Sequence, residues 1–360
     1  MSSMRDSSTH PGADADRTAG RFATRARPGL TSAEDAAPGP TRARVRDAAA
    51  GIDACAPRAL ARRLRDTGKI DLSLARLLEG HVNAIHLIDV HGDDHARLRL
   101  RADLDAGMLY GVWGADATPP VCVREGQMHG VKCFASGLGV VDRAIVTVGR
   151  GETQRLYVVD ATDPARHDLA AWNMSGMQAS RSGRFDCGGL RGEPLGPLGC
   201  YTAEPHFVGG TWRIAAVALG GAVGLLDRCA DVLRARDQIG AEAHMLRLAP
   251  VALRIVSAWP AILRAAQIST GPEGASHPDR AAVLSVSMRL LSEELGQDCI
   301  RAAERSVGLS MFADDDTTGR HARDLACYLR QARRDAFLLQ AGSAMLEGAG
   351  GMSEWLDDHD

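Results

Sequence analysis

Helix-like and strand-like patterns occupy separate stretches of this 360-residue chain, and that order limits the folds it can adopt. Apolar residues recur at helical spacing in residues 41–106, short strand-like segments fill 107–204, and the helical period returns in 205–348. Because strands and helices are segregated rather than alternating, the order argues against a doubly wound parallel sheet. We therefore expect an α+β fold with an N-terminal helical domain, a middle β domain and a C-terminal four-helix bundle.

The two ends of the chain differ in composition from the rest. Residues 1–40 are rich in Ser, Ala, Asp, Arg, Gly and Pro and have no apolar periodicity, which predicts a disordered tail. Residues 349–360 finish in the acidic run SEWLDDHD, which predicts a second, short mobile tail. The folded part should therefore begin near residue 41 and end near residue 348.

Net charge, cysteine usage and hydropathy limit the partners. The formal net charge is -3, which gives no reason to expect a nucleic-acid partner. The eight cysteines have no CxxC spacing and the N-terminus lacks the apolar stretch of a signal peptide, so we expect a reduced, cytoplasmic chain. The longest apolar run, residues 214–226, is too short to cross a bilayer, so no membrane span is expected.

Local patterns place the expected elements within each region. One N-terminal helix should start near Asp71, which can cap it, and end at Gly92. Segments rich in Val, Ile and aromatic residues predict strands, and these are 109–113, 131–136, 144–148 and 155–159. Breaks near Gly240, at 269–278 and at 313–319 divide the last region into about four long helices, as in a bundle.

The C-terminal region contains the most specific pattern, in residues 305–337. Acyl-CoA dehydrogenases have a glutamine-led Gly-Gly-x-Gly-Phe loop, followed at a fixed distance by Arg-Asp on the next helix. This chain resembles that pattern without a gap, and the residues in corresponding positions are Arg305, Gly308, Phe312, Arg323, Asp324 and Tyr328. It departs from the pattern because Arg305 replaces the Gln, and Leu309 and Met311 replace two of the glycines.

Stretches of the β region also resemble the family. Residues 107–120 resemble the family's strand and loop beside the flavin ring, with Trp113 near a flavin-contact position. Residues 130–137 resemble its Gly-x-Lys-x-Trp-Ile-Thr-Asn hairpin, in which Phe134 stands for the Trp and Ser136 for the Thr.

Two further stretches resemble the family, one before and one after residue 209. Residues 172–186 resemble the family's Gly-x-Arg-x-Ser-x-Thr stretch, which leads into a strand. Arg236 and Gly240 match an Arg-x-x-Phe-Gly motif whose Arg usually reaches the flavin diphosphate of a neighbouring subunit, although Ile239 replaces the Phe.

The resemblance covers roughly residues 68–346 and implies more than a fold. It implies FAD as the cofactor and an acyl thioester, on CoA or a carrier protein, as the substrate. It also implies a homodimer or homotetramer, with helices at 214–226 and 325–346 as packing surfaces. The electron acceptor stays open.

The implied cofactor residues suit the chemistry of a flavin, which needs a flat apolar wall, donors for its polar edge and a cation for its diphosphate. Trp113 and Phe134 on adjacent strands would form the wall, Ser136 would donate a hydrogen bond, and Arg236 would pair with phosphate. The implied cofactor-binding set is Trp113, Phe134, Ser136, Arg236, Arg305 and Gly308. The plainer alternative makes them core residues, a turn residue and surface charges.

The expected catalytic carboxylate is missing. Counted from Arg323 and Asp324, the family's catalytic Glu falls on Ala332. Removal of the α-proton of an acyl thioester needs a base, and an alanine cannot act as one. Asp335 is the nearest candidate, three residues further along and so on a neighbouring helix face.

Other clusters of polar residues give weaker signals. Of the histidines between 81 and 95, only His91 and His95 have i,i+4 spacing, and they straddle Gly92, so no metal site is expected. The run at 314–316 has three aspartates but no EF-hand pattern and is expected to be a solvated loop.

Two other functions remain open besides thioester oxidation. One is a flavin-dependent monooxygenase or oxidase on the same fold, which needs no family Glu. The other is a non-catalytic relative that serves as a binding module, which predicts a colourless purified protein.

Overall fold

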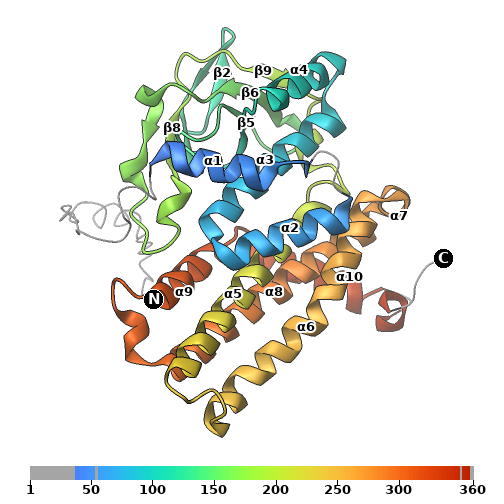
Figure 1. Ribbon diagram of the computed structural model, residues 1–360. Coiled ribbons are helices and arrows are strands. Elements are labelled where there is room, and N and C mark those ends of the chain that lie inside the picture. The colour runs from blue at the N-terminus through green and yellow to red at the C-terminus, as the bar shows by residue number, and fades with distance from the viewer. Residues whose placement is uncertain (1–36, 53–55, 349–350, 357–360) are drawn as a thin grey trace, which may run out of the picture.

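The computed structural model describes residues 37–52, 56–348 and 351–356, and it has the predicted α+β architecture (Figure 1). The β region packs on the N-terminal helices, and the long C-terminal helices lie below them in this view. Residues 1–36, 53–55, 349–350 and 357–360 lie outside the description, so most of the expected tail does too. The predicted tail boundary at residue 40 is wrong, because the first helix already begins at Pro38, a residue type favoured at the first helical position.

The described part of the N-terminal region forms four helices. They are α1 (Pro38–Ala49), α2 (Pro57–Ile70), α3 (Leu72–His91) and α4 (Asp94–Asp105). The predicted limits of α3 are confirmed, since the Asp71 side chain accepts a hydrogen bond from Leu74 N at 3.0 Å and Gly92 follows the last turn.

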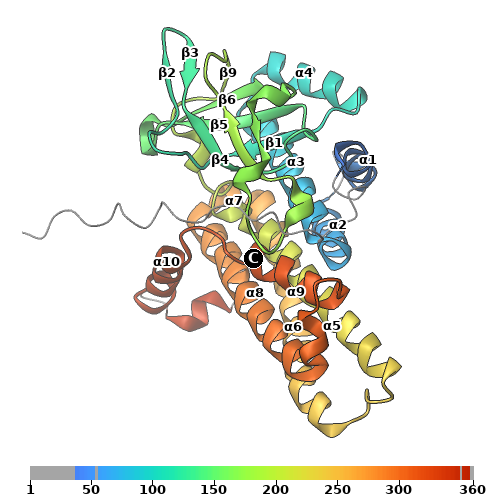
Figure 2. The same cartoon turned by 90° about the vertical axis from the view of Figure 1, so that its left-hand side faces the viewer.

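The middle region contains three small sheets (Figure 2). The strands are β1 (Tyr110–Trp113), β2 (Cys122–Arg124), β3 (Gln127–His129), β4 (Val131–Ala135), β5 (Arg143–Val148), β6 (Arg155–Asp160), β7 (His167–Asp168), β8 (Gly183–Asp186) and β9 (Glu193–Leu195). The largest sheet has the order β1-β5-β6-β9, in which only the β1–β5 pair is parallel. A second sheet has the order β4-β8-β7, and β2 pairs with β3. The four predicted strands are confirmed as β1, β4, β5 and β6.

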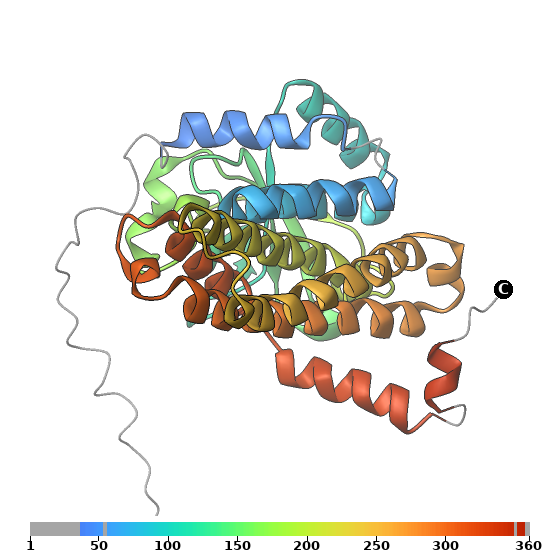
Figure 3. The same cartoon turned by 60° about the horizontal axis from the view of Figure 1, so that its bottom comes forward.

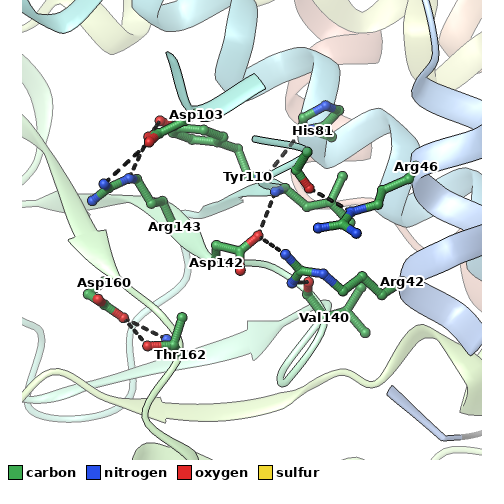
Figure 4. Close-up of polar contacts among 12 residues, drawn as sticks. Arg42, Arg46, His81, Asp103, Tyr110, Val140, Asp142, Arg143, Asp160 and Thr162 are labelled. Atoms are coloured by element: carbon green, nitrogen blue, oxygen red, sulfur yellow. Dashed lines mark hydrogen bonds and ion pairs between the residues drawn. The ribbon is translucent and has the colours of Figure 1, made fainter. Parts of the chain in front are cut away.

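Buried polar contacts hold the N-terminal helices on the largest sheet (Figure 4). Asp142 accepts hydrogen bonds from Leu109 N at 2.7 Å and from the Arg42 guanidinium of α1 at 2.6 Å. The backbone N–H of Tyr110 on β1 donates to Nδ1 of His81 on α3 at 3.1 Å. His81 therefore has a structural role, and it must stay unprotonated at Nδ1 to keep this bond.

Acid should weaken the fold through His81. Burial lowers the pKa of His81 to about 4, so between pH 6.5 and 4 the unfolded chain binds a proton that the folded chain excludes. The contribution of His81 to the free energy of unfolding is fully present above pH 6.5. It is lost as the pH falls toward 4, and the loss amounts to about 3 kcal/mol. Urea unfolding at pH 7, 5.5 and 4.5 should show this loss, and His81→Gln should flatten it. An equally steep pH dependence in His81→Gln would contradict this role.

The C-terminal region is a helical bundle with one departure from the prediction. Its helices are α5 (Trp212–Ala235), α6 (Glu242–Thr270), α7 (Pro272–Ser276), α8 (Pro278–Val307), α9 (Thr317–Tyr328) and α10 (Arg334–Leu346). The expected last helix at 325–346 is broken after Tyr328, and Arg333 has a left-handed φ of 63°. As a result α10 leaves the bundle and lies beside it, in contact with α8 (Figure 3).

The helix at 214–226 is not a surface for another copy, which corrects that expectation. It belongs to α5, which is mostly buried between α2 and α8 of its own chain. By contrast, α10 exposes Leu338, Leu339 and Leu346. The expected mobile acidic end is also partly wrong, because Met352–Trp355 forms a 3-10 turn and Arg280 lies 5.1 Å above the Trp355 ring.

One described helix, α6, is long and apolar enough to cross a membrane by length and mean hydropathy alone. It packs along α8 as an outer helix of the bundle. A single such helix is weak evidence for a span, because helices of globular proteins pass the same test. The absence of a membrane span therefore stays a prediction.

Glycines allow α2 and α5 to approach closely. A Cβ on Gly68 would lie 2.6 Å from Val217 O, and a Cβ on Gly220 would overlap Arg65 O. Gly220→Ala must therefore push the two helices apart, and we expect it to destabilise the protein by about 1–3 kcal/mol. Gly342→Ala on α10 is the matched control, because its Cβ would meet nothing within 4 Å. Thermal unfolding should show a loss for Gly220→Ala alone, and equal behaviour of the two variants would contradict this packing.

Candidate functional site

A cavity of about 290 Å³ lies where the end of β1 meets α3, α5, α8 and the segment before α10. Its walls carry apolar residues such as Leu87, Val112 and Ile214. Its charged lining residues are Arg76, Glu79, Arg213, Arg289 and Arg333. The volume lies at the small end of the range for small-molecule sites, about 300–1,000 Å³.

Among the residues that the structure describes, Glu79 is the only carboxylate that lines this cavity. Its side chain is 2% exposed. It pairs with Arg76 at 3.1 Å, and it accepts hydrogen bonds from the Tyr328 hydroxyl at 3.0 Å and from Asn83 Nδ2 at 3.3 Å. Burial, followed by the Glu79 charge, raises the pKa of Tyr328, so the phenol stays protonated and donates. These partners satisfy the Glu79 carboxylate.

Glu79 was not among the site residues expected from the sequence, although a signal for it was present. On α3 it follows Leu72 and Ala75 and precedes Val82 at helical spacing, so a charge interrupts an apolar stripe. A carboxylate in a core position needs buried partners, and that requirement marks a site of interest.

Two buried arginines also line the cavity, Arg213 on α5 and Arg289 on α8. Arg213 Nε donates to Asn83 Oδ1 at 2.6 Å, and Arg289 Nη2 donates to the carbonyl of Ala332 at 2.7 Å. Burial lowers the pKa of Arg213 to about 10, and the Glu79 charge offsets this only in part. Both arginines therefore remain charged at neutral pH.

Three histidines gather beside Arg213. His86 and His206 approach within 3.3 Å through ring nitrogens, and the His91 ring lies 6.1 Å from that of His206. Burial, and then the charge of Arg213, lowers the pKa of His86 to about 3, so it is neutral in ordinary buffers. Within the described part of the chain, no group of three or more His, Cys, Asp or Glu side chains could hold a metal ion.

Of the two positions at which a catalytic carboxylate was expected or suggested, only one lines the cavity. Ala332, where the family Glu would fall, lines the cavity. Asp335 does not, because it lies in the first turn of α10 with a largely exposed side chain that pairs with Arg334 at 3.4 Å. The suggestion that Asp335 replaces the missing base is therefore wrong.

Trp113 and Phe134 do not form one wall, which corrects the expectation for Trp113. The Trp113 ring is 2% exposed, packs on Phe185 at 4.8 Å, and donates its indole N–H to Ser136 O at 3.0 Å. Phe134 instead is 58% exposed, has a φ of 55°, and meets the Trp172 ring edge-on at 6.3 Å. Phe134 therefore offers a ring face, while Trp113 positions the strand behind it.

The direction of hydrogen bonding at Ser136 is also reversed. The Ser180 hydroxyl donates to Met177 O at 2.6 Å, so Ser182 must donate to Ser180 at 2.8 Å. The Ser136 hydroxyl must then donate to Ser182 at 2.9 Å. Because its proton is committed, Ser136 Oγ can only accept a hydrogen bond from a bound molecule.

Arg236, Arg305 and Gly308 lie together at the other end of the bundle. Arg236 follows α5 and donates to Val307 O and Ser310 Oγ, both at 2.8 Å. Arg305 belongs to the last turn of α8, and Gly308 ends that helix with a φ of 80°. These ends of α5 and α8 lie away from the β region (Figures 1 and 2). The structure therefore does not bring them together with Phe134 and Ser136.

Asp324, of the Arg323-Asp324 pair, joins α9 to the β region. The Asp324 carboxylate accepts a hydrogen bond from Met177 N at 2.6 Å and so fixes α9 to the segment before β8. Burial raises the pKa of Asp324 to about 6. Asp324 and Arg323 line a second cavity, of about 330 Å³.

The residues near β4 fit a flavin ring in several respects. Phe134 supplies an exposed aromatic face, and its left-handed backbone is uncommon for an aromatic residue. Ser136 supplies an acceptor beside it. Phe134 and Ser136 are therefore the residues that would hold the ring.

Comparison with known proteins gives a result for the fold only. No model of a protein family matches the chain, and no curated protein does. Dibenzothiophene monooxygenase TdsC from Paenibacillus sp. A11-2 has a similar structure, with a TM-score of 0.69, 16% identity, and coverage of 85% of this chain and 88% of that one. TdsC has also been solved with FMN bound.

Two other solved structures are similar to a comparable degree. Butyryl-CoA dehydrogenase from Megasphaera elsdenii has a TM-score of 0.66 and 17% identity, covering 78% of this chain and 80% of that one. Methanesulfinate monooxygenase MsuC from Pseudomonas fluorescens has a TM-score of 0.67 and 15% identity, covering 85% and 88%. The resemblance found in the sequence is therefore confirmed for the architecture, and the chain has the acyl-CoA dehydrogenase fold.

Proposed function

We propose that the chain is a flavin-dependent oxidoreductase of the monooxygenase type, with its substrate in the cavity beside β1. A bound flavin would supply two-electron chemistry and, when reduced by a separate reductase, would activate O₂, so that one oxygen atom enters the substrate and the other leaves as water. Solved structures with this fold include two monooxygenases, which supports the proposal.

The observation that carries the proposal is that the described residues place no free carboxylate in the cavity. Ala332 stands where a dehydrogenase would have its Glu, and Glu79 is committed to Arg76, Tyr328 and Asn83. Dehydrogenation of an acyl thioester depends on removal of the α-proton, and a positioned base contributes roughly 10²–10⁴-fold. Oxygen transfer to a substrate does not need that step.

The chain's own residues have three roles in this proposal. Phe134 and Ser136 bind and orient the ring, with Trp113 fixing Ser136 from behind. The apolar walls of the cavity, including Leu87 and Ile214, exclude water from the reacting atoms. His86, held neutral by burial, shares one hydrogen bond with His206 and so fixes the orientation of both rings at the cavity wall.

Anaerobic and aerobic mixing of the flavin-loaded protein tests the proposal. Butyryl-CoA, isobutyryl-CoA and octanoyl-CoA should leave the flavin absorbance unchanged under anaerobic conditions. The dithionite-reduced protein should be reoxidised quickly when O₂ is added. Bleaching of the flavin by any of these thioesters would contradict the proposal and favour a dehydrogenase.

A dehydrogenase is the second candidate, and Glu79 is the observation in its favour. Glu79 is a carboxylate within the cavity, and it would act as the base if it parted from Arg76, Tyr328 and Asn83. In that case Glu79→Gln should abolish bleaching by thioesters while flavin stays bound.

The identity of the flavin belongs to the same proposal. One chain offers Phe134 and Ser136 for the ring, whereas Arg236 lies at the far end of the bundle with both terminal nitrogens bound to the 307–310 segment. FMN would therefore need one chain, and FAD held through Arg236 would need a homodimer or homotetramer. Release of the flavin by denaturation and its identification by chromatography would separate the two.

A further inference from the structure

The cavity beside β1 holds more positive charge than its lining neutralises. Of the described residues, four arginines line it, among which Arg333 is exposed, and Glu79, already paired with Arg76, is the only lining carboxylate. A buried charge without a counter-ion is costly, because water that would stabilise it has been excluded. The buried part of this excess lies on Arg213 and Arg289, and it favours an anion in the cavity.

Arg289 shows the deficit most directly. Its side chain is 4% exposed on α8, and its Nε has no hydrogen-bond partner among the described residues. Glu293, one turn further along α8, pairs through Oε1 with Arg334 at 3.2 Å, and its Oε2 also has no hydrogen-bond partner among the described residues. One donor of a buried guanidinium is thus unused at the wall of the cavity.

Arg213 is the second buried cation that lines the cavity. It is 6% exposed, and within the described chain it forms no ion pair. Only its Nε has a hydrogen bond, to Asn83, while its guanidinium lies 5.1 Å from the Trp212 ring. Its two terminal nitrogens therefore remain available, and a guanidinium fork matches the paired oxygens of an oxyanion.

The rest of the cavity limits the size and character of such an anion. The walls formed by Leu87, Val112, Phe207 and Ile214 are apolar, and the space of about 290 Å³ admits only a small molecule. A small apolar body with one oxyanion group fits both the walls and the cations.

We propose that this cavity binds a small organic oxyanion, a carboxylate or a sulfur oxyacid, through Arg213 and Arg289. The inference rests on the proposed function in one respect: the anion is the substrate that is oxidised. Binding itself needs only the chain, so it can be measured without a flavin.

Calorimetric titration of the purified full-length protein, with and without flavin, tests the inference. The probes are butyrate, benzoate and benzenesulfinate, with butyramide and benzamide as neutral matches. At least one anion should bind about tenfold or more tightly than its amide. Arg213→Gln and Arg289→Gln should each weaken that anion about 10- to 100-fold, while Arg254→Gln on the exposed face of α6 should not.

The outcomes separate this inference from the proposed function. Anion selectivity that depends on Arg213 and Arg289 in a protein that binds no flavin would support the inference and overturn the proposed function. Flavin binding with equal affinity for acids and amides would overturn the inference alone. If a Gln variant fails to fold, the relative affinities of the unmodified protein for acid and amide still test whether the cavity selects an anion. The relative affinities for sulfinate and carboxylate then identify the oxyanion.

Discussion

Replacing Glu79 with alanine should lower the free energy of unfolding by about 3–5 kcal/mol. Glu79 is the only lining carboxylate among four arginines, so its removal leaves Arg76 unpaired in the cavity wall. It also leaves the buried hydroxyl of Tyr328 without its acceptor. Urea unfolding at pH 7 measures the loss.

Two variants make the Glu79 prediction specific. Glu79→Gln keeps an oxygen for the Tyr328 hydroxyl but removes the charge, so its loss should be intermediate. Glu294→Ala removes an exposed carboxylate that contacts Arg334, and surface pairs of this kind contribute about 0–1 kcal/mol. Equal losses for Glu79→Ala and Glu294→Ala would show that Glu79 does not balance the cavity's charge.

Asp116→Ala should destabilise the β region to a similar extent, about 3–5 kcal/mol. Asp116 accepts from Lys132 Nζ at 2.6 Å, and the Lys132 side chain is fully buried on β4, two residues before Phe134. Without Asp116, the ammonium has only Thr147 as a hydrogen-bond partner. The change should lower the midpoint of thermal unfolding.

The double variant Asp116→Ala/Lys132→Met provides the decisive comparison for this pair. It removes both charges, so it should recover most of the stability lost in Asp116→Ala. Asp231→Ala, which breaks an exposed pair with Arg234, is the surface control and should have little effect. A double variant that is less stable than Asp116→Ala would mean that Lys132 contributes mainly by packing of its stem.

Much of the fold could be predicted because its signals are local. Helical and strand periodicities fix the type of an element over a few turns, and Asp71 and Gly92 mark the ends of α3 by their capping chemistry. The break between α9 and α10 could not be seen, because residues 329–333 are mostly good helix formers and the left-handed residue there is Arg333 rather than a glycine.

The site was harder to predict because it depends on contacts between distant segments. The resemblance identified Phe134 and Ser136, but the sequence could not tell which face of β1 carries Trp113, and the structure buries that ring against Phe185. The hydroxyl chain from Ser136 to Met177 O links residues 41 positions apart, so the reversed hydrogen bond at Ser136 had no local signal.

The charged cavity has the same origin. Glu79, Arg213 and Arg289 come from three helices, and each interrupts an apolar face of its own helix. Taken singly, each is an ordinary charged residue in a helical stretch. Only the packing of α3, α5 and α8 brings them to one cavity, which periodicity within a single helix does not encode.

Titration of the purified protein with FMN and with FAD, followed by quenching of flavin fluorescence, tests the central claim most directly. We predict one flavin per chain, with an affinity that Phe134→Ala weakens about tenfold. Trp355→Ala is the control and should leave the affinity unchanged, because the Trp355 ring packs against Arg280 of α8. Failure of both flavins to bind, or equal binding to the unmodified protein and Phe134→Ala, would contradict a flavin site on β4.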